Sequence, residues 1–120
     1  MAALSDDDMK SQIFSLFVTL QFTQLQDKEE FLVLVRPLAD YIRREEPTTL
    51  AFDVICHDAD PLQVMLVERY QEKATAFLQI HKSSPQFLND RPKLQQMQND
   101  GRVVISGDSY LDSGIGFIGR

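Results

Sequence analysis

The strict alternation of side chains over residues 12–22 constrains this chain more than any other feature of its sequence. Successive side chains of an extended strand point to opposite faces of a sheet. One face would carry only apolar side chains, from Phe14, Leu16, Val18, Leu20 and Phe22. The opposite face would be half apolar, with Ile13, Ser15, Phe17, Thr19 and Gln21. The pattern predicts a strand covered on both faces, with a second cover that tolerates polar groups.

A helix is expected next, because the apolar spacing changes to three and four residues. Its apolar face, about 100° wide, would consist of Phe31, Leu34, Val35, Leu38 and Ile42. The acidic residues 27–30 suit the positively polarised start of a helix. Pro37 removes one backbone hydrogen bond and should bend the helix, which must end before Pro47.

Two strands, 49–57 and 62–70, are predicted to form a hairpin through the turn-forming segment 58–61. A second helix should start after Glu72, with Ala74, Phe77, Leu78 and His81 on one face. Ser83-Ser84-Pro85 would break it and start a short third helix, which Pro92 should distort or split. The buried contacts of that helix are expected from Phe87, Leu88, Leu94 and Met97.

A last strand is predicted over 103–110, with Gly107 as a bulge or a point of close approach. The order strand, helix, strand, strand, helix, strand predicts an α+β fold, the ferredoxin-like split βαβ arrangement with both helices on one face of an antiparallel sheet. We expect a flexible acidic tail over 1–10, one domain over 11–110 and a Gly-rich arm over 111–120. The arm is either a docking segment for a neighbouring molecule or a frayed terminus.

Apolar residues on both faces of strand 62–70 make a bare second sheet face unfavourable. Val64 and Leu66 alternate with Met65 and Val67, so each face carries apolar surface. The simplest cover is a second copy of the sheet, which predicts a homodimer with a barrel-like core. The alternative is a monomer whose own arm folds over the sheet.

Composition limits the class of protein. With 120 residues, 43% of them hydrophobic and 25% charged, the chain has the composition of one ordinary globular domain. The single cysteine, Cys56, fits a reducing compartment, and neither a membrane span nor a secretory signal is recognisable, so we expect a cytoplasmic protein. A net charge of −6 argues against a nucleic-acid partner.

Few residues suggest chemistry, and no phosphate-binding, nucleophile or metal-ligand motif is present. His81 is expected to point inward, either as a core or helix-end histidine or as a group that exchanges a proton with a ligand. Glu68 and Tyr70 share one strand face; Glu68 would pair with Arg36, Arg43 or Arg69, or act in a pocket, and Tyr70 would bind a ligand carbonyl or cap the dimer core. Phe77, one turn before His81, is expected to contact the substrate.

Several segments together resemble the antibiotic biosynthesis monooxygenase family. They are 46–52, Asp60-Pro61, Glu68-Arg69-Tyr70 and the run from Ala74 through His81 to Phe87, and the similarity extends over about residues 11–110. The family usually has Gly where this chain has Thr48, a difference that concerns turn geometry. The resemblance implies a homodimeric α+β barrel with one pocket per subunit. Its haem-degrading members use an Asn, Trp and His set, and this chain has no Trp, so a haem-degrading role is not expected. The family also includes cofactor-free oxygenases, and the resemblance to these implies that no cofactor is used.

The resemblance implies an oxygenase that acts without a cofactor on a small hydroxylated aromatic or quinol, with His81 removing the substrate proton. Two alternatives stay open at this stage. One is a non-redox isomerase or detoxifying enzyme for a small metabolite. The other is a non-catalytic dimeric module that binds a ligand or partner.

Overall fold

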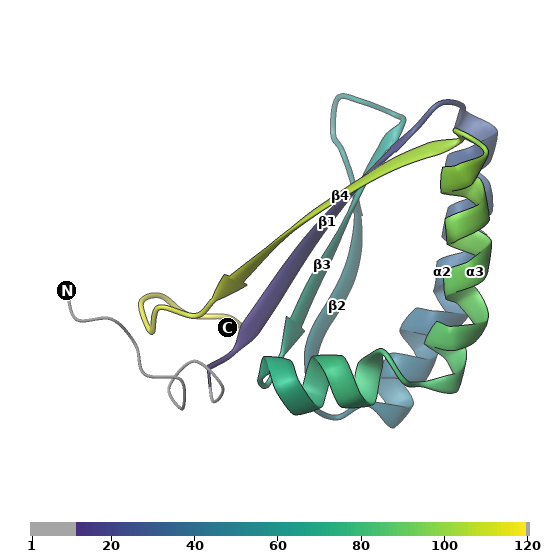
Figure 1. Cartoon of the computed structure of the whole chain (residues 1–120). Coiled ribbons are helices and arrows are strands. Elements are labelled where there is room, and N and C mark those ends of the chain that lie inside the picture. The colour runs from purple at the N-terminus through teal and green to yellow at the C-terminus, as the bar shows by residue number, and fades with distance from the viewer. Residues whose placement is uncertain (1–11, 120) are drawn as a thin grey trace.

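The computed structural model describes residues 12–119 as a four-stranded antiparallel sheet with three helices (Figure 1). In chain order the elements are β1 (Phe14–Phe22), α2 (Leu25–Glu45), β2 (Thr49–Cys56), β3 (Gln63–Tyr70), the π-helix η1 (Lys73–His81), α3 (Pro85–Asn99) and β4 (Val103–Leu111). The strand order is β2-β3-β1-β4. This confirms the predicted ferredoxin-like α+β fold.

The core lies between α2, α3 and one face of the sheet, called here the inner face. Facing pairs such as Val18 with Leu66 and Leu20 with Val64 put the apolar positions of β1 and β3 on this face. The predicted apolar face of α2 is confirmed, since Phe31, Val35, Leu38 and Ile42 are all buried. Burial of apolar side chains is the dominant favourable contribution to the free energy of folding.

Both internal prolines lie inside continuous helices. Pro37 is within α2, and Pro92 is within α3. Of the two outcomes expected at Pro92, distortion or splitting of the helix, the splitting does not occur. In each helix, the residue four positions earlier would lose its hydrogen-bond donor, and those residues, Val33 and Leu88, have side chains 74% and 57% exposed. The prolines therefore lie on the solvent side, where water can bond the freed carbonyls. The same geometry makes Leu88 a surface residue, not the core contact that the sequence suggested.

The second predicted helix forms with a wider spacing than expected. In η1 the amide of Lys82 donates to the carbonyl of Phe77, five residues back, at 3.0 Å. The buried side chains are accordingly Ala76 and His81, whereas Leu78 is 46% exposed. The predicted face, which assumed α-helical spacing, was wrong for Ala74 and Leu78, which are exposed, whereas His81 points inward and Phe77 is half-buried.

Irregularity in the sheet lies in β2 rather than β4. The pairing of β2 with β3 shifts between Thr49 and Ala51, whereas β4 pairs with β1 without a shift on either side of Gly107. The expected bulge at Gly107 is therefore absent from β4. A Cβ atom at Gly107 would lie 3.8 Å from Cγ2 of Val18, the residue opposite it on β1, and 3.7 Å from the carbonyl oxygen of Phe17, which are ordinary van der Waals contacts.

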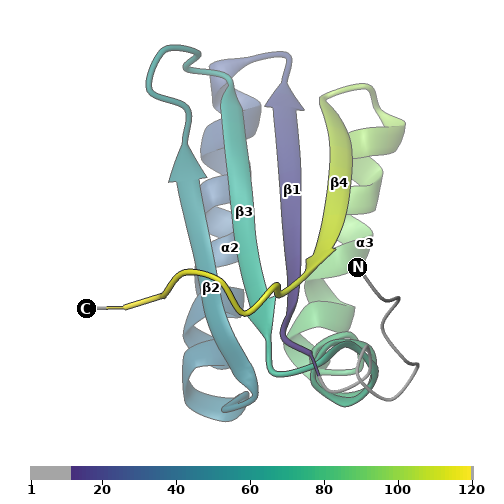
Figure 2. The same cartoon turned by 90° about the vertical axis from the view of Figure 1, so that its left-hand side faces the viewer.

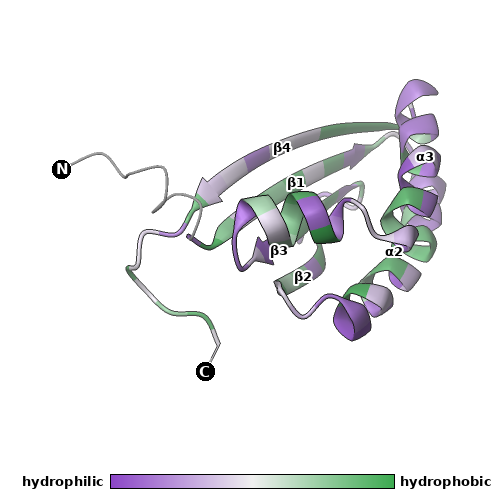
Figure 3. Cartoon of the chain, turned by 60° about the horizontal axis from the view of Figure 1, so that its bottom comes forward, coloured by the Kyte–Doolittle hydropathy of each residue, from purple (hydrophilic) through white to green (hydrophobic). Residues whose placement is uncertain are grey.

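The second face of the sheet, called here the outer face, has no helix over it (Figure 2). It carries half-buried apolar side chains from Phe17, Met65 and Val67. The segment 112–119 leaves β4 and crosses one end of this face (Figure 2). Apolar residues follow one another along it (Figure 3), and Ile115 and Ile118 are 89% and 64% exposed.

The arm is anchored where it starts. The amide of Asp112 donates to the carbonyl of Ile13 at 3.0 Å, and its carboxylate lies 4.0 Å from Arg69. The predicted acidic tail, 1–10, lies outside the described residues. None of the helices within 12–119 is long and apolar enough to cross a membrane.

Candidate functional site

A cavity of about 290 Å³ lies between the inner face of the sheet and the three helices. Its walls are formed by Leu16, Val18, Phe31, Leu34, Val35, Leu38, Phe52, Leu66, Glu68, Phe77, His81, Lys82, Phe87, Asp90, Arg91 and Leu94. Most of this lining is aliphatic or aromatic. Such a cavity suits a small ligand with an apolar body and few polar groups.

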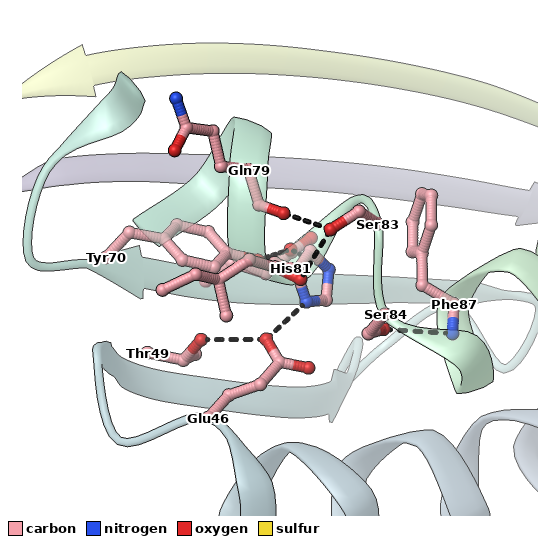
Figure 4. A network of polar contacts seen from close by, with 10 residues as sticks. Glu46, Thr49, Tyr70, Gln79, His81, Ser83, Ser84 and Phe87 are labelled. Carbon is pink, nitrogen blue, oxygen red and sulfur yellow. Dashed lines mark hydrogen bonds and ion pairs between the residues drawn. The ribbon is translucent and has the colours of Figure 1, made fainter. Parts of the chain in front are cut away.

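His81 is the central polar group of this wall (Figure 4). Its side chain is 2% exposed, with Nδ1 3.0 Å from Oε1 of Glu46 and Nε2 3.7 Å from Oε1 of Glu68. Four aromatic rings surround the imidazole at centroid distances of 5.1–6.1 Å: Phe52, Tyr70, Phe77 and Phe87. The ring is thus held between two carboxylates inside an aromatic cage.

Capping interactions on both sides of His81 fix its backbone. At the start of η1, Oε1 of Glu72 accepts from the amides of Thr75 and Ala76, each at 2.6 Å. After η1, the amide of Ser84 donates to the carbonyl of His81 at 3.2 Å, and the Ser84 hydroxyl caps α3 by accepting from Phe87 at 3.2 Å. A π-helix that ends at His81, followed directly by a capped α-helix, therefore fixes the position of the imidazole.

Glu68 faces the cavity from β3, and its neighbours differ from those expected. The hydroxyl of Tyr70 donates to Oε1 of Glu68, the same atom that faces His81. The prediction of an arginine partner was wrong, because Arg69 points to the outer face and pairs with Asp112, while Arg36 and Arg43 are exposed. Burial raises the pKa of Glu68 above its ordinary value, and the Tyr70 hydrogen bond only partly opposes this.

Tyr70 lies behind Glu68 and does not line the cavity. Its side chain is fully buried, and burial followed by the neighbouring charge of Glu68 raises the pKa of the phenol. Its hydroxyl has one proton, which is donated to Glu68. Neither of the two roles expected from the sequence, a ligand contact or a cap on the dimer core, fits this position on the inner face.

Phe77 lines the cavity and is half-buried beside the imidazole. Its ring lies nearly parallel to that of His81, at 20° and 6.1 Å, and contacts Tyr70 at 4.9 Å. The Lys82 ammonium lies 5.5 Å from the centre of the same ring. Phe77 therefore connects the polar end of the cavity with its apolar walls.

Sequence reasoning missed Glu46 as a member of the site. Glu46 is the C-cap residue of α2, where the backbone leaves the helical conformation, and only 2% of its surface is exposed. It lies four positions after Ile42, so it continues the buried face of α2 in the same helical register. The sequence did contain a signal for the burial of Glu46: this carboxylate follows the apolar face of the helix in register and directly precedes Pro47, which ends the helix.

No metal centre is visible in the part of the chain that the structure describes. Within residues 12–119 there is no group of three His, Cys, Asp or Glu side chains that could hold a metal ion. His57 has a structural role: its Nδ1 accepts from the amides of Ala59 and Asp60 at 3.0 and 2.8 Å in the hairpin turn. The neighbouring Cys56 is exposed.

Over much of its length, the sequence matches a known protein family. The family model described as antibiotic biosynthesis monooxygenase matches residues 16–89, which is more than half of the chain. The chain belongs to the antibiotic biosynthesis monooxygenase family. The match includes most of β1, all of α2, the hairpin and η1, and the first residues of α3. It therefore includes the polar residues described above, Glu46, Glu68, Tyr70 and His81. No match was found among curated proteins.

Solved structures with the same fold include other members named for this family. A protein from Nitrosomonas europaea, described as a candidate antibiotic biosynthesis monooxygenase, superposes with a TM-score of 0.71 at 20% identity, over 88% of this chain and 94% of that one. One from Caulobacter crescentus, with the same description, gives 0.69 at 17% identity over 89% and 97%. A conserved protein from Bacteroides thetaiotaomicron, described as a possible oxidoreductase, gives 0.71 at 15% identity over 85% and 99%. At sequence identities of 15–20%, the similarity to these structures shows a shared fold and nothing more.

Proposed function

We propose that this member of the antibiotic biosynthesis monooxygenase family is a cofactor-independent monooxygenase for a small hydroxylated aromatic or quinol. The observation that carries the proposal is the imidazole of His81, fully buried beside Glu68 in the wall of a cavity whose lining is mostly aliphatic and aromatic. A planar aromatic body would fill the apolar part of the cavity, and its hydroxyl would meet the polar end.

In this mechanism Nε2 of His81 accepts the proton of the substrate hydroxyl. The resulting anion is electron-rich, and its ring carbon reduces dioxygen, the co-substrate, and forms a carbon–oxygen bond with it. The O–O bond then breaks, one oxygen stays on the substrate as a carbonyl, and the other leaves as water with two substrate hydrogens. The substrate supplies all four electrons that reduce dioxygen, two for the oxygen that it retains and two for the oxygen that leaves as water, so no separate reductant is required.

The surroundings of His81 suit this task. Once protonated, the imidazole lies between the carboxylates of Glu46 and Glu68, which stabilise its positive charge. Apolar walls exclude water and leave the substrate anion poorly solvated, which favours its oxidation. Phe77, Phe52 and Phe87 offer faces against which an aromatic ring can pack.

Oxygen consumption with a panel of quinols and anthrones tests the proposal. The informative variant is His81→Asn, because the Asn amide can still donate to Glu46 while the basic Nε2 is lost; the exposed His57→Asn is the matched control. We expect consumption with at least one substrate, loss of it in His81→Asn and full activity in His57→Asn. Product formation at the same rate under argon would instead indicate an isomerase, and no turnover with bound ligand a non-catalytic binding module.

The active unit is proposed to be a cytoplasmic homodimer formed through the outer faces of two sheets. Phe17, Met65 and Val67 give this face a continuous apolar centre, and Tyr110 contacts Phe17 edge-on at 5.5 Å. A second copy brings an identical surface with the same curvature, as a two-fold interface requires. The arm, 112–119, starts at the edge of the same face and would place Ile115 and Ile118 against the partner. The cytoplasmic location rests on the exposed thiol of Cys56, which fits a reducing compartment.

A further inference from the structure

We infer that Glu46 is a positioning residue that keeps the proton of neutral His81 on Nδ1 and so leaves Nε2 as the basic atom facing the cavity. The inference rests on the proposed function for its catalytic meaning. Its physical content, the tautomer of one buried histidine, is independent of any substrate. Two observations carry it: the 3.0 Å contact of Nδ1 with Glu46 and the 3.7 Å separation of Nε2 from Glu68.

The tautomer follows from the donors and acceptors at the ring. A carboxylate can only accept hydrogen bonds, so the 3.0 Å contact with Glu46 requires hydrogen on Nδ1 of His81. Neutral imidazole carries a single ring hydrogen, and Nε2 is then an unprotonated acceptor. At 3.7 Å, Glu68 is too far from Nε2 to compete for this hydrogen in the same way.

Glu46 is held firmly enough to impose this choice. Its Oε1 also accepts from the hydroxyl of Thr49 at 3.2 Å. Its backbone amide donates to Ile42 at 2.9 Å, and its carbonyl accepts from the amide of Thr49 at 3.0 Å. The carboxylate is therefore tied to the end of α2 and the start of β2, and its side chain is 1% exposed. A group fixed by two elements can orient a ring in a third.

The other charged groups around the ring do not set this tautomer. From β3 come Glu68 and, behind it, Tyr70, whose proton is donated to Glu68. Lys82 follows His81 in the chain with its ammonium over Phe77, and Asp90 on α3 accepts from Gln86 and Asn89 at 2.9 and 3.1 Å. Arg91 on α3 is exposed at the cavity wall, and β2 contributes the apolar ring of Phe52.

Removing Glu46 should therefore reverse the tautomer. Glu68 would be the only carboxylate left beside the ring, and hydrogen on Nε2 would become favourable because it could then donate toward Glu68. Nε2 would change from a proton acceptor to a donor. An enzyme in this state keeps its cavity and its histidine, but the atom that faces the substrate can no longer take a proton.

Nitrogen-15 NMR of histidine side chains measures this directly, because the chain has only two histidines. Long-range proton–nitrogen spectra are recorded at increasing alkaline pH until they no longer change, so that both rings are observed in the neutral form. We expect His81 as the Nδ1–H tautomer and His57 as the Nε2–H tautomer, since Nδ1 of His57 accepts two backbone hydrogen bonds. The two residues thus act as opposite standards in one spectrum. An Nε2–H or doubly protonated ring at His81 in the wild type would overturn the inference.

Three variants complete the test. Glu46→Leu is expected to shift His81 to the Nε2–H tautomer, whereas Glu46→Gln, whose amide oxygen can still accept from Nδ1, should restore Nδ1–H. Glu45→Leu, at the exposed neighbouring position, is the matched control and should leave the spectrum unchanged. An Nδ1–H tautomer that persists in folded Glu46→Leu would refute the role of Glu46. If that variant does not fold, the wild-type and Glu46→Gln spectra decide.

Activity separates this inference from the proposed function. If a quinol substrate is found, Glu46→Leu should lower kcat by roughly 10²–10⁴-fold, the usual contribution of general-base catalysis, with little change in KM, and Glu46→Gln should recover part of the loss. A merely structural role would instead change stability and KM without moving the tautomer. If no substrate consumes oxygen but the tautomers are as expected, the proposed function fails and the assignment of Glu46 stands.

Discussion

Enlarging Val18 tests the cavity that underlies the proposed site. Val18 lies on the inner face of β1, lines the cavity and is only half-buried. The residue opposite it on β4 is Gly107, which has no side chain to obstruct a larger ring. Val18→Phe adds four carbon atoms, and at ~0.8 kcal/mol per buried methylene their burial is worth at most about 3 kcal/mol. Because the new ring also loses rotational freedom, we expect the free energy of unfolding to rise by about 0–2 kcal/mol.

Val64→Phe is the matched control on the neighbouring strand. Val64 lies on the inner face of β3, is 0% exposed and does not line the cavity. There the same substitution overpacks the core, which costs about 1–3 kcal/mol. The two variants thus share their chemistry and strand context and differ in the sign of the expected effect.

Urea denaturation of both variants and binding of 1-naphthol to each provide the readouts. Wild type at one hundred times the dissociation constant of the probe should gain about 2.7 kcal/mol of stability, and Val18→Phe should gain none because its ring occupies the cavity. Equal destabilisation of Val18→Phe and Val64→Phe would show that the cavity is already filled in solution. Undiminished probe binding by Val18→Phe would place the ligand site elsewhere.

Three further predictions concern the buried carboxylate, the dimer and the arm. Burial raises the pKa of Glu68 in the folded state above the ordinary value of 4.5. The contribution of Glu68 to the free energy of unfolding should therefore fall as the pH rises from the unfolded-state pKa through the folded-state pKa, by ~1.4 kcal/mol for each pH unit between the two pKa values. Glu68→Gln, measured by urea denaturation from pH 4 to 8, should remove this decline, and parallel stability curves for the two proteins would contradict the argument. Wild type should sediment near twice 13.8 kDa at micromolar concentration; Val67→Asp on the outer face should be monomeric, whereas Val33→Asp, on the exposed side of α2, should stay dimeric. Deletion of residues 113–120 should raise the dimer dissociation constant at least tenfold, since each large apolar side chain left in water costs ~1.5–3 kcal/mol, and an unchanged constant would make the arm a free end.

The sequence alone was sufficient for the fold, because the fold depends on local periodicity. Alternation over β1, three-and-four spacing over α2 and turn residues between β2 and β3 each specify one element, and their order is that of the ferredoxin-like fold. The inward direction of His81 and the family membership were also correctly predicted. Local rules failed where tertiary context prevailed. Pro92 stays inside α3 because that side of the helix faces water, and η1 widens to π spacing, which moves the buried face to Ala76 and His81.

The composition of the site was decided only by the tertiary structure. The sequence assigned Glu68 to one face of its strand but could not identify its partner. The candidate partners lie on other elements, and periodicity within one element does not determine how the elements pack together. Glu46 is 35 positions from His81, and its role depends on how the end of α2 meets the end of η1 across the start of β2. Sequence patterns report which side of an element is buried. A hydrogen bond of 3.0 Å between two buried side chains requires positions set by the packing of three elements at once, and only the folded chain defines those positions.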